Sequence, residues 1–504
     1  MVKSTVVITV MTVLGIAVGF VLQLLVAYLF GASQARDAYF AAIAIPNYIF
    51  LLVSGSLGLT FLPHIVKMKR EEPVNFNEFV SNSLTILALI LSVVALLNAV
   101  FARSIVDAVY SGFSQNERGL SSYLVTLLSP VILFQNLSFL LSAVYYSENK
   151  FIVPALSQIF TSGIAVVGVV FFARYLGIAS LALGTGFGSG LFFLVEFALA
   201  GGLFSYRPRV KFDSRIGRWF VFSIPLLAGG IFSRSNTVIE RMIASHMHLG
   251  SISYLGYSNQ IVSLLSTIAT QGLAITIFPL LSKAWVDGRL EDLHSYFHNG
   301  VKFVLFATIP LVVVFFFWGL PMVELIFERG AFTRLDAYEV YRTIQMSILS
   351  LIFLGVGGVT TKVFYATGST TEIALISVFE IFVYIIASIF LSAYLSFLGL
   401  ALANVLSTGT NILLSLALIN RRFIKVEILE LARYSMVVTG FAVLPVLGLG
   451  IIASVVGVGL HGDGAGLAKV GFALLSYLLL FYFTKSKTTE DLRRMFRQYV
   501  LSNK

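Results

Sequence analysis

Residues 301–320 read VKFVLFATIPLVVVFFFWGL and contain one charged side chain, Lys302. A helix of this length rises about 30 Å, which matches the hydrocarbon core of a bilayer. In lipid such a run satisfies its backbone hydrogen bonds as a helix. Similar runs recur from end to end, and the chain is 58% hydrophobic, with a mean hydropathy of +0.93. The sequence therefore predicts an all-α integral membrane protein.

The apolar runs predict fourteen transmembrane helices. Their predicted ranges are 6–30, 38–66, 80–101, 121–146, 151–172, 178–204, 219–246, 253–281, 301–320, 337–366, 373–395, 399–419, 431–456 and 467–484.

The basic residues predict the orientation. With the N-terminus in the cytoplasm, most Lys and Arg fall in inner loops, and the outer loops hold only Arg36, Arg103, Arg118, Arg174, Arg329 and Arg334. The positive-inside rule then places both termini in the cytoplasm, as in a multi-pass protein of a bacterial inner membrane. The net charge of +10 reflects this topology, so we predict membrane lipids as partners and no nucleic acid.

Few residues suit chemistry on a bound metal or cofactor. The chain has no cysteine, which excludes disulfides and thiolate ligands. His294 and His298 have metal-compatible spacing but no further ligands in the sequence. We predict no metal site, no cofactor and no enzymatic activity.

The chain also repeats itself. Residues 144–156, VYYSENKFIVPAL, align with 363–375, VFYATGSTTEIAL, and YLGIASLAL (175–183) aligns with YLSFLGLAL (394–402) at the same offset. GLTFLPHIVK (58–67) aligns with AITIFPLLSK (274–283) at nearly that offset. An even number of predicted helices separates the copies, which indicates two parallel six-helix lobes.

The predicted domains follow from this repeat. They are an N-lobe (1–205), a basic cytoplasmic linker (206–218), a C-lobe (219–423), two further helices (424–484) and a basic amphipathic cytoplasmic tail (485–504). Two similar lobes that face one another create a central cavity with alternating access, which is typical of a transporter.

One predicted span is unusually polar. Residues 231–245, IFSRSNTVIERMIAS, hold Arg234 and Arg241 seven residues apart, on one stripe of a continuous helix, and Asn236 and Glu240 on a neighbouring stripe. A charge within the bilayer costs about 2.5–3.5 kcal/mol and is usually functional. These side chains predict a site for an anionic head group, because Arg grips phosphate oxygens in two places. Ion pairs with neighbouring glutamates, or snorkelling of Arg241, are the structural alternatives.

Other intramembrane polar residues are weaker candidates. Gln23, Asn259 and Gln260 suit the wall of a hydrated cavity or interhelical hydrogen bonds. Glu196 and Glu380 are candidates for ion coupling, with ion pairs to Lys362 or Arg342 as the alternative. GTGFGSG (184–190) resembles a phosphate loop but lies in a predicted span, so we predict small-residue helix contacts there.

Four stretches resemble a known family. GASQARDAYFAAIAIPN (31–47), GLTFLPHIVK (58–67), ELIFERGAFT (324–333) and VFYATGSTTEIAL (363–375) are similar to signature stretches of the MurJ/MviN family of lipid II flippases. That family lies within a superfamily that includes multidrug exporters. The resemblance implies a flippase that moves a polyprenyl-pyrophosphate-linked saccharide to the outer leaflet, with the last two helices forming a groove for the lipid tail. Enzymes of cell-envelope synthesis are the implied protein partners.

The sequence departs from the family at its basic residues. Where the family places arginines in helices 1, 2 and 8, this chain has Leu22 and Gln23, Phe50 and Leu51, and Asn259 and Gln260. Asp37 matches the family's acidic residue at the start of helix 2, and Arg36 is an additional charge. We expect Arg234 and Arg241 to replace the missing arginines.

Several functions stay open from sequence. Lipid II is one substrate, and an exopolysaccharide or O-antigen repeat unit suits a relocated basic site equally well. A cation-coupled multidrug exporter is an alternative that would favour an acidic, aromatic cavity. A glycosyltransferase would need a catalytic outer loop with paired carboxylates; the outer loops near 102–120 and 320–336 are too short for this, although Asp107 and Glu117 keep the alternative open. A non-transporting scaffold of cell-envelope synthesis is the remaining alternative.

Overall fold

The computed structural model describes residues 2–211, 214–456 and 463–483, which form helices and connecting turns with no strand among them. The predicted tail, 485–504, lies outside the described residues. Eleven helical segments in the described part are long and apolar enough to cross a membrane, or twelve if the bent pair α14–α15 counts as one span. The chain is therefore a multi-span helical membrane protein.

Packing divides the chain into two compact units. Unit 1 comprises residues 1–253 with 329–333, and unit 2 comprises 254–328 with 334–504. The elements up to residue 244 are α1 (Val2–Phe30), α2 (Gln34–Val53), the π-helical η1 (Ser54–Gly58), α3 (Leu59–Glu71), α4 (Pro73–Val100), α5 (Ala102–Val109), α6 (Gln115–Ser147), α7 (Ile152–Ala155), α8 (Ser157–Leu176), α9 (Ala179–Leu199), the 3₁₀-helical η2 (Ala200–Gly202), α10 (Ser214–Ser233) and α11 (Asn236–Ala244). The later helices are α12 (Ser251–Val286), α13 (Leu290–Phe327), α14 (Arg334–Ser347), α15 (Ser350–Ala366), α16 (Thr370–Leu395), α17 (Phe397–Arg422), α18 (Ile428–Val456) and α19 (Asp463–Phe483).

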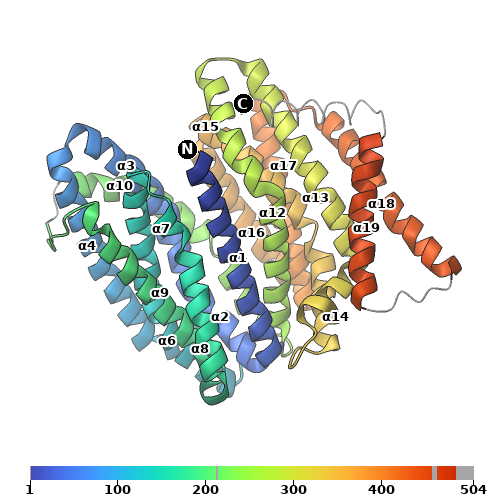
Figure 1. Cartoon of the computed structure of the whole chain (residues 1–504), viewed down its shortest axis with the longest axis horizontal. Helices are drawn as coiled ribbons and strands as arrows, with labels where there is room; N and C mark the ends of the chain where they lie inside the picture. The colour runs from blue at the N-terminus through green and yellow to red at the C-terminus, as the bar shows by residue number, and fades with distance from the viewer. Residues whose placement is uncertain (1, 212–213, 457–462, 484–504) are drawn as a thin grey trace. The chain divides into compact units, whose positions relative to one another are not determined.

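In unit 1 the long helix α6 packs against α2, α4, α5 and α9 (Figure 1). Beside it, the rings of Phe61, Phe79 and Trp219 form an aromatic centre, with 5.0 Å between the ring centroids of Phe61 and Trp219. Trp219 belongs to α10, so the seventh predicted span packs with unit 1. The predicted lobes, 1–205 and 219–423, rest on the internal repeat rather than on packing, and they stay a prediction.

The segment before α10 is held by α4. Asn82 donates from Nδ2 to the Lys211 carbonyl (2.6 Å) and accepts from the Lys211 N–H (2.9 Å). Ser81 accepts in the same way from the Arg207 N–H. Ser81 and Asn82 are both buried. These bonds therefore fix the segment 207–211 against α4.

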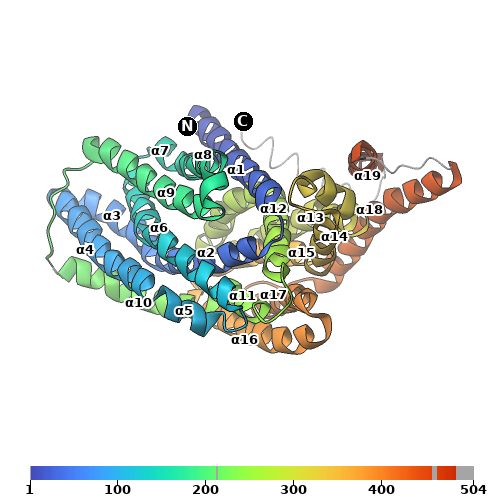
Figure 2. The ribbon, with the colours of Figure 1, turned by 90° about the horizontal axis from the view of Figure 1, so that it is seen from below.

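The glycine-rich stretch 184–190 forms a close helix contact, as predicted. Helices α8 and α9 lie side by side (Figure 2). A Cβ on Gly184 would lie 2.8 Å from Ala165 Cα, and one on Gly188 would lie 2.9 Å from the Thr161 carbonyl oxygen. Neither distance leaves room for a side chain, so these glycines set the separation of the two helices.

Unit 2 is organised around α13, which packs against α14, α15, α18 and α19. Lys302 of α13, a buried residue, pairs with Glu430 of α18 at 2.7 Å. The Tyr477 hydroxyl of α19 donates to the Phe306 carbonyl at 3.2 Å. The last two helices are thereby joined to the core of unit 2.

Three predicted continuous spans are interrupted. The span 38–66 contains η1, 219–246 breaks between α10 and α11, and 337–366 bends by 45° between α14 and α15. At the last two breaks, serine hydroxyls bond to carbonyls of the preceding turn, a contact that weakens or bends a helix locally. Ser235 Oγ donates to the Phe232 carbonyl (2.7 Å), and Ser350 Oγ donates to the Ser347 carbonyl (2.6 Å).

Candidate ligand-binding site

The first turns of α2 bury an arginine. Arg36 is only 1% exposed, and its Nη2 donates to Gln23 Oε1 of α1 at 2.7 Å. Its Cζ lies 3.9 Å from the ring centroid of Phe40, one helical turn further along α2. A cation over an aromatic face is stabilised by the ring quadrupole. Arg36 is therefore held in place by an amide and a ring.

The same ring also contacts Arg241 of α11. Arg241 is 7% exposed, and its Cζ lies 4.8 Å from the Phe40 centroid. Its Nε and Nη1 form no hydrogen bond within the described part of the chain. Two guanidinium groups thus share one aromatic ring in unit 1, and one of them has unused donors. We call Arg36, Phe40 and Arg241 the arginine cluster.

Asp37 has a different role from its neighbour. Its carboxylate accepts from the N–H groups of Gly250 and Ser253, both at 2.7 Å, and from Ser253 Oγ at 2.5 Å. Gly250 and Ser253 flank the first residues of α12, where N–H groups lack helical partners. A negative charge is also favourable at a helix N-terminus. Asp37 therefore caps α12.

Arg234 lies in the two-residue break between α10 and α11, where we expected a continuous helix. The backbone stays close to helical there, because the Arg234 N–H donates to the Gly230 carbonyl and the Ile239 N–H donates to the Ser235 carbonyl. The shared stripe of Arg234 and Arg241 stays a prediction. The side chain is exposed, and its guanidinium lies on Gly55 of η1, where an added Cβ would be 2.7 Å from Nη2. The two arginines consequently have different surroundings within unit 1.

Asn236 and Glu240 do lie on one continuous helix, α11. Glu240 is buried and interacts electrostatically with Arg241. Asn236 is half-buried, and its Oδ1 accepts no hydrogen bond among the described residues. Glu240 therefore offsets part of the positive charge of the arginine cluster.

The remaining polar candidates are divided between the units. Gln23 joins the arginine cluster through its bond to Arg36. Asn259 and Gln260 are half-buried residues of α12 in unit 2. The structure thus unites Gln23, Arg36 and Arg241 in unit 1.

The two membrane glutamates form no ion pair in the described part of the structure. Glu196 is fully buried in α9 and accepts from Ser142 Oγ at 2.8 Å. Glu380 of α16 is half-buried and accepts from Asn411 Nδ2 at 2.7 Å. The expected alternative partner Arg342 pairs with Glu339, and Lys362 lies over the rings of Phe278 and Tyr365. Hydrogen bonds therefore hold both glutamates in place of salt bridges.

Phe40 is the member of the arginine cluster that sequence reasoning missed. It follows Arg36 by four residues in a predicted helix, a spacing that brings side chains together. That spacing was available in the sequence. The contact with Arg241, about two hundred residues away along the chain, was not, because it depends on how α11 packs on α2.

Comparison with known proteins gives consistent results. The family described as lipid II flippase MurJ matches residues 26–463. A probable lipid II flippase MurJ from Buchnera aphidicola subsp. Schizaphis graminum is 25% identical over 422 residues, 82% of each chain. The lipid II flippase MurJ of Burkholderia cenocepacia is 25% identical over 360 residues, covering 69% of this chain and 68% of that one.

Solved structures share the fold. A lipid II flippase MurJ in an inward closed conformation superposes with a TM-score of 0.81 at 21% identity, covering 98% of this chain and 100% of that one. An inward-facing multidrug resistance MATE transporter of the MOP superfamily gives 0.69 at 12% identity, covering 82% of this chain and 98% of the transporter. Since the family match spans most of the chain, this protein belongs to the lipid II flippase MurJ family.

Proposed function

We propose that this protein is a flippase of the bacterial inner membrane that moves lipid II from the inner to the outer leaflet by alternating access. Membership of the family and a fold of many membrane-crossing helices support this function. The expected partners are the lipid-linked saccharide and membrane lipids. Enzymes that make or consume lipid II are further proposed partners, since they act on the same molecule.

The observation that carries the site is the arginine cluster. A diphosphate bears negative charge on oxygens that accept hydrogen bonds, and Arg241 has two buried nitrogens with donors to spare. Charge-assisted hydrogen bonds to phosphate are about twice as strong as neutral ones. We assign Arg241 and Arg36 to the diphosphate, with Gln23 and Phe40 positioning Arg36. Arg234, Asn236, Asn259 and Gln260 are proposed as additional polar contacts along the path of the head group.

The finer architecture is also part of the proposal. We propose fourteen transmembrane helices, with α12 and α19 added to the spans identified above and both termini in the cytoplasm. The repeat supports two six-helix lobes related by an axis along the membrane normal. We propose that α18 and α19 bind the polyprenyl tail, for which their exposed apolar residues, such as Leu444, Leu447 and Leu475, are suited.

The multidrug exporter and the scaffold are less well supported. In the arginine cluster, Arg241 has two buried nitrogens that form no hydrogen bond among the described residues, and such donors suit an anion rather than the cationic drugs an acidic cavity would take. A scaffold would have no use for unsatisfied donors buried in the membrane, since each costs about 1–3 kcal/mol when unpaired.

The function is tested by depleting the protein in its host and following the sidedness of lipid II. We expect lipid II to accumulate on the inner leaflet and to reach the outer leaflet again when the native chain is restored. Restoration with R241A should fail while the variant is present in the membrane at native levels. Unchanged sidedness after depletion would refute the flippase assignment.

A matched control is R289A. Arg289 lies in the turn before α13 and pairs with Asp287 and Asp292, so its loss removes one positive charge away from the arginine cluster. We expect R289A to restore lipid II export fully. Equal failure of both variants would mean that overall charge, rather than the cluster, matters.

A further inference from the structure

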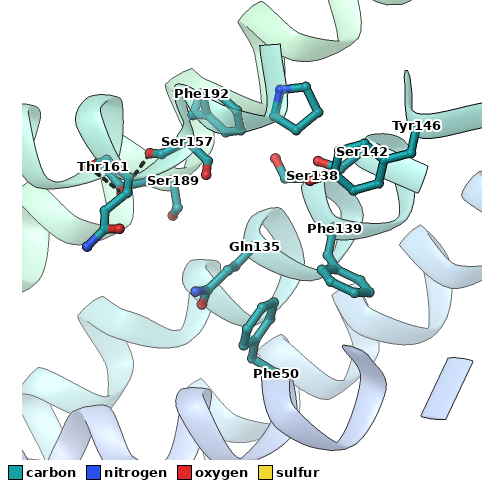
Figure 3. Close-up of a pocket in the computed structure, with 12 residues that line it drawn as sticks. Phe50, Gln135, Ser138, Phe139, Ser142, Tyr146, Ser157, Thr161, Ser189 and Phe192 are labelled. Atoms are coloured by element: carbon teal, nitrogen blue, oxygen red, sulfur yellow. Dashed lines mark hydrogen bonds between the residues drawn. The ribbon is translucent and has the colours of Figure 1, made fainter. Parts of the chain in front are cut away.

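Unit 1 contains a polar cavity apart from the arginine cluster. Its volume is about 410 Å³, and residues of α2, α6, α7, α8 and α9 line it. Figure 3 shows Ser138 and Ser142 next to one another on one side, with Ser157 and Ser189 on the other. Hydroxyl and amide groups make up much of the wall. A cavity with many such groups can hold water inside a membrane protein.

Glu196 of α9 lies next to Ser142, one of the residues that line the cavity. Its side chain is fully buried, and Oε1 accepts from Ser142 Oγ at 2.8 Å. The Tyr145 hydroxyl donates to its backbone carbonyl at 2.7 Å. Ser138, which also lines the cavity, interacts with the same carboxyl group. The carboxyl group is thus joined to the cavity wall by the Ser142 hydroxyl.

Among the described residues, Glu196 belongs to no ion pair, and its titratable neighbours are Tyr145 and Tyr146 of α6. These phenols are neutral at physiological pH. An ionised carboxylate without a partner is costly inside a membrane. The site therefore lacks one positive charge.

We propose that Glu196 is a proton-binding site, loaded from water in the cavity through Ser142. A hydronium ion donates a proton to Ser142 Oγ while the original hydroxyl proton of Ser142 passes to Glu196 Oε1, which leaves water and a neutral carboxyl group. Release follows the same path in reverse. A proton fits better than a metal cation, because Glu196 itself does not line the cavity, and a cation there would meet neutral groups.

This site deepens the proposed function, on which its role in transport rests. Loading and release of one proton change the charge buried in unit 1, so a proton gradient would bias the states that alternate during transport. Glu196 would then couple flipping to that gradient.

The protonated carboxyl group is directly measurable. Infrared spectra of the full-length protein in lipid nanodiscs at neutral pH should contain a C=O stretch from a protonated carboxyl group that is lost in E196Q. The matched control E380Q removes another membrane glutamate and should retain this band. S142A should keep the band at a higher frequency, because one hydrogen bond to the carboxyl group is gone.

Two results would overturn the proposal. One is a spectrum that neither E196Q nor S142A changes. The other is a band that disappears when sodium is added at constant pH, which would identify a metal cation as the ligand. Because S142A retains the glutamate, it gives an answer even if E196Q does not fold.

Transport measurements separate the two proposals. In liposomes with an imposed pH gradient, flipping of labelled lipid II by the native protein should accelerate several-fold, and E196Q should lose this response. If E196Q responds like the native protein, the coupling role is wrong. If the native protein does not flip lipid II at all, the proposed function fails while the infrared result still decides the proton site.

Discussion

At the scale of single residues, Phe40 explains how two arginines lie buried in the same part of unit 1. Like charges repel strongly in a low-dielectric interior, yet both guanidinium groups contact the ring of Phe40. Each such contact contributes about 0.5–2 kcal/mol. Glu240 and the Gln23 amide add further compensation. Asp37 also acts on Arg241, and Arg241 retains donors for a bound anion.

Replacement of Phe40 by leucine separates these effects. F40L keeps an apolar side chain, and such exchanges usually cost less than about 1.5 kcal/mol in packing. It removes the aromatic face from both arginines, so we expect flipping of lipid II to slow several-fold while the melting temperature falls little. The control F232L changes an exposed phenylalanine of α10 and should affect neither. Native flipping by F40L would show that the ring does not position the arginines.

Asp37 is expected to matter for stability. D37A removes three hydrogen bonds at the start of α12, and bonds to a charged group contribute about 1.5–3 kcal/mol each when measured singly. We therefore expect a clearly lower melting temperature for the detergent-solubilised protein, with D37N intermediate because its amide oxygen still accepts. A D37A protein that melts like the native one would contradict the capping role.

Tyr110 gives a prediction on pH. Its hydroxyl donates to the Ala41 carbonyl at 2.8 Å, and burial raises the pKa of Tyr110. A raised pKa means that the folded state holds the proton more firmly, so the stabilisation is complete below about pH 10, the unfolded value, and is lost as the pH rises above it. The melting temperature of Y110F should fall less steeply above pH 10 than the melting temperature of the native chain. Parallel curves would refute this.

At the scale of helices, small residues decide how closely α8 and α9 approach. G184A adds one methyl group where 2.8 Å separates the new Cβ from Ala165 Cα. Alanine normally favours a helix over glycine by about 1 kcal/mol, yet here we expect the melting temperature to fall. G163A in α8 meets no atom within 4 Å and should be neutral or stabilising. The opposite order would contradict the close packing of these helices.

Helix existence was predictable from sequence, and helix continuity was not. Hydropathy averages over many residues, so Ser235 and Ser350 did not alter the prediction of a span, although each hydroxyl bonds to the preceding turn. The glycine contacts at 184–190 were predictable because small residues at a four-residue spacing have one common use in membranes.

For the candidate site, Arg241 was identified from its charge alone. Its partner Phe40 was not, since contacts between distant helices leave no local pattern.

At the scale of the whole molecule, the absence of cysteine makes the topology easy to test. N116C lies in the turn region at the start of α6, on the predicted outer side, and E291C lies at the start of α13, on the predicted inner side; both positions are exposed. A membrane-impermeant thiol reagent should label N116C in intact cells and E291C only after permeabilisation. Reversed labelling would contradict the proposed orientation.

Family membership fixes the class of transporter, and the arginine cluster is the site that we propose for its substrate. The resemblance places the family's arginines where this chain has Leu22 and Gln23, Phe50 and Leu51, and Asn259 and Gln260. We propose that Arg241 and Arg36 supply the positive charge for the diphosphate.

The most direct measurement is the flipping of labelled lipid II in liposomes that contain the purified protein. Native protein should bring label to the opposite leaflet faster than protein-free liposomes do. R241A should slow this by about 10- to 100-fold, which corresponds to the loss of one charge-assisted hydrogen bond of about 1.5–3 kcal/mol. Native protein without activity, or R241A as fast as native, would contradict the account.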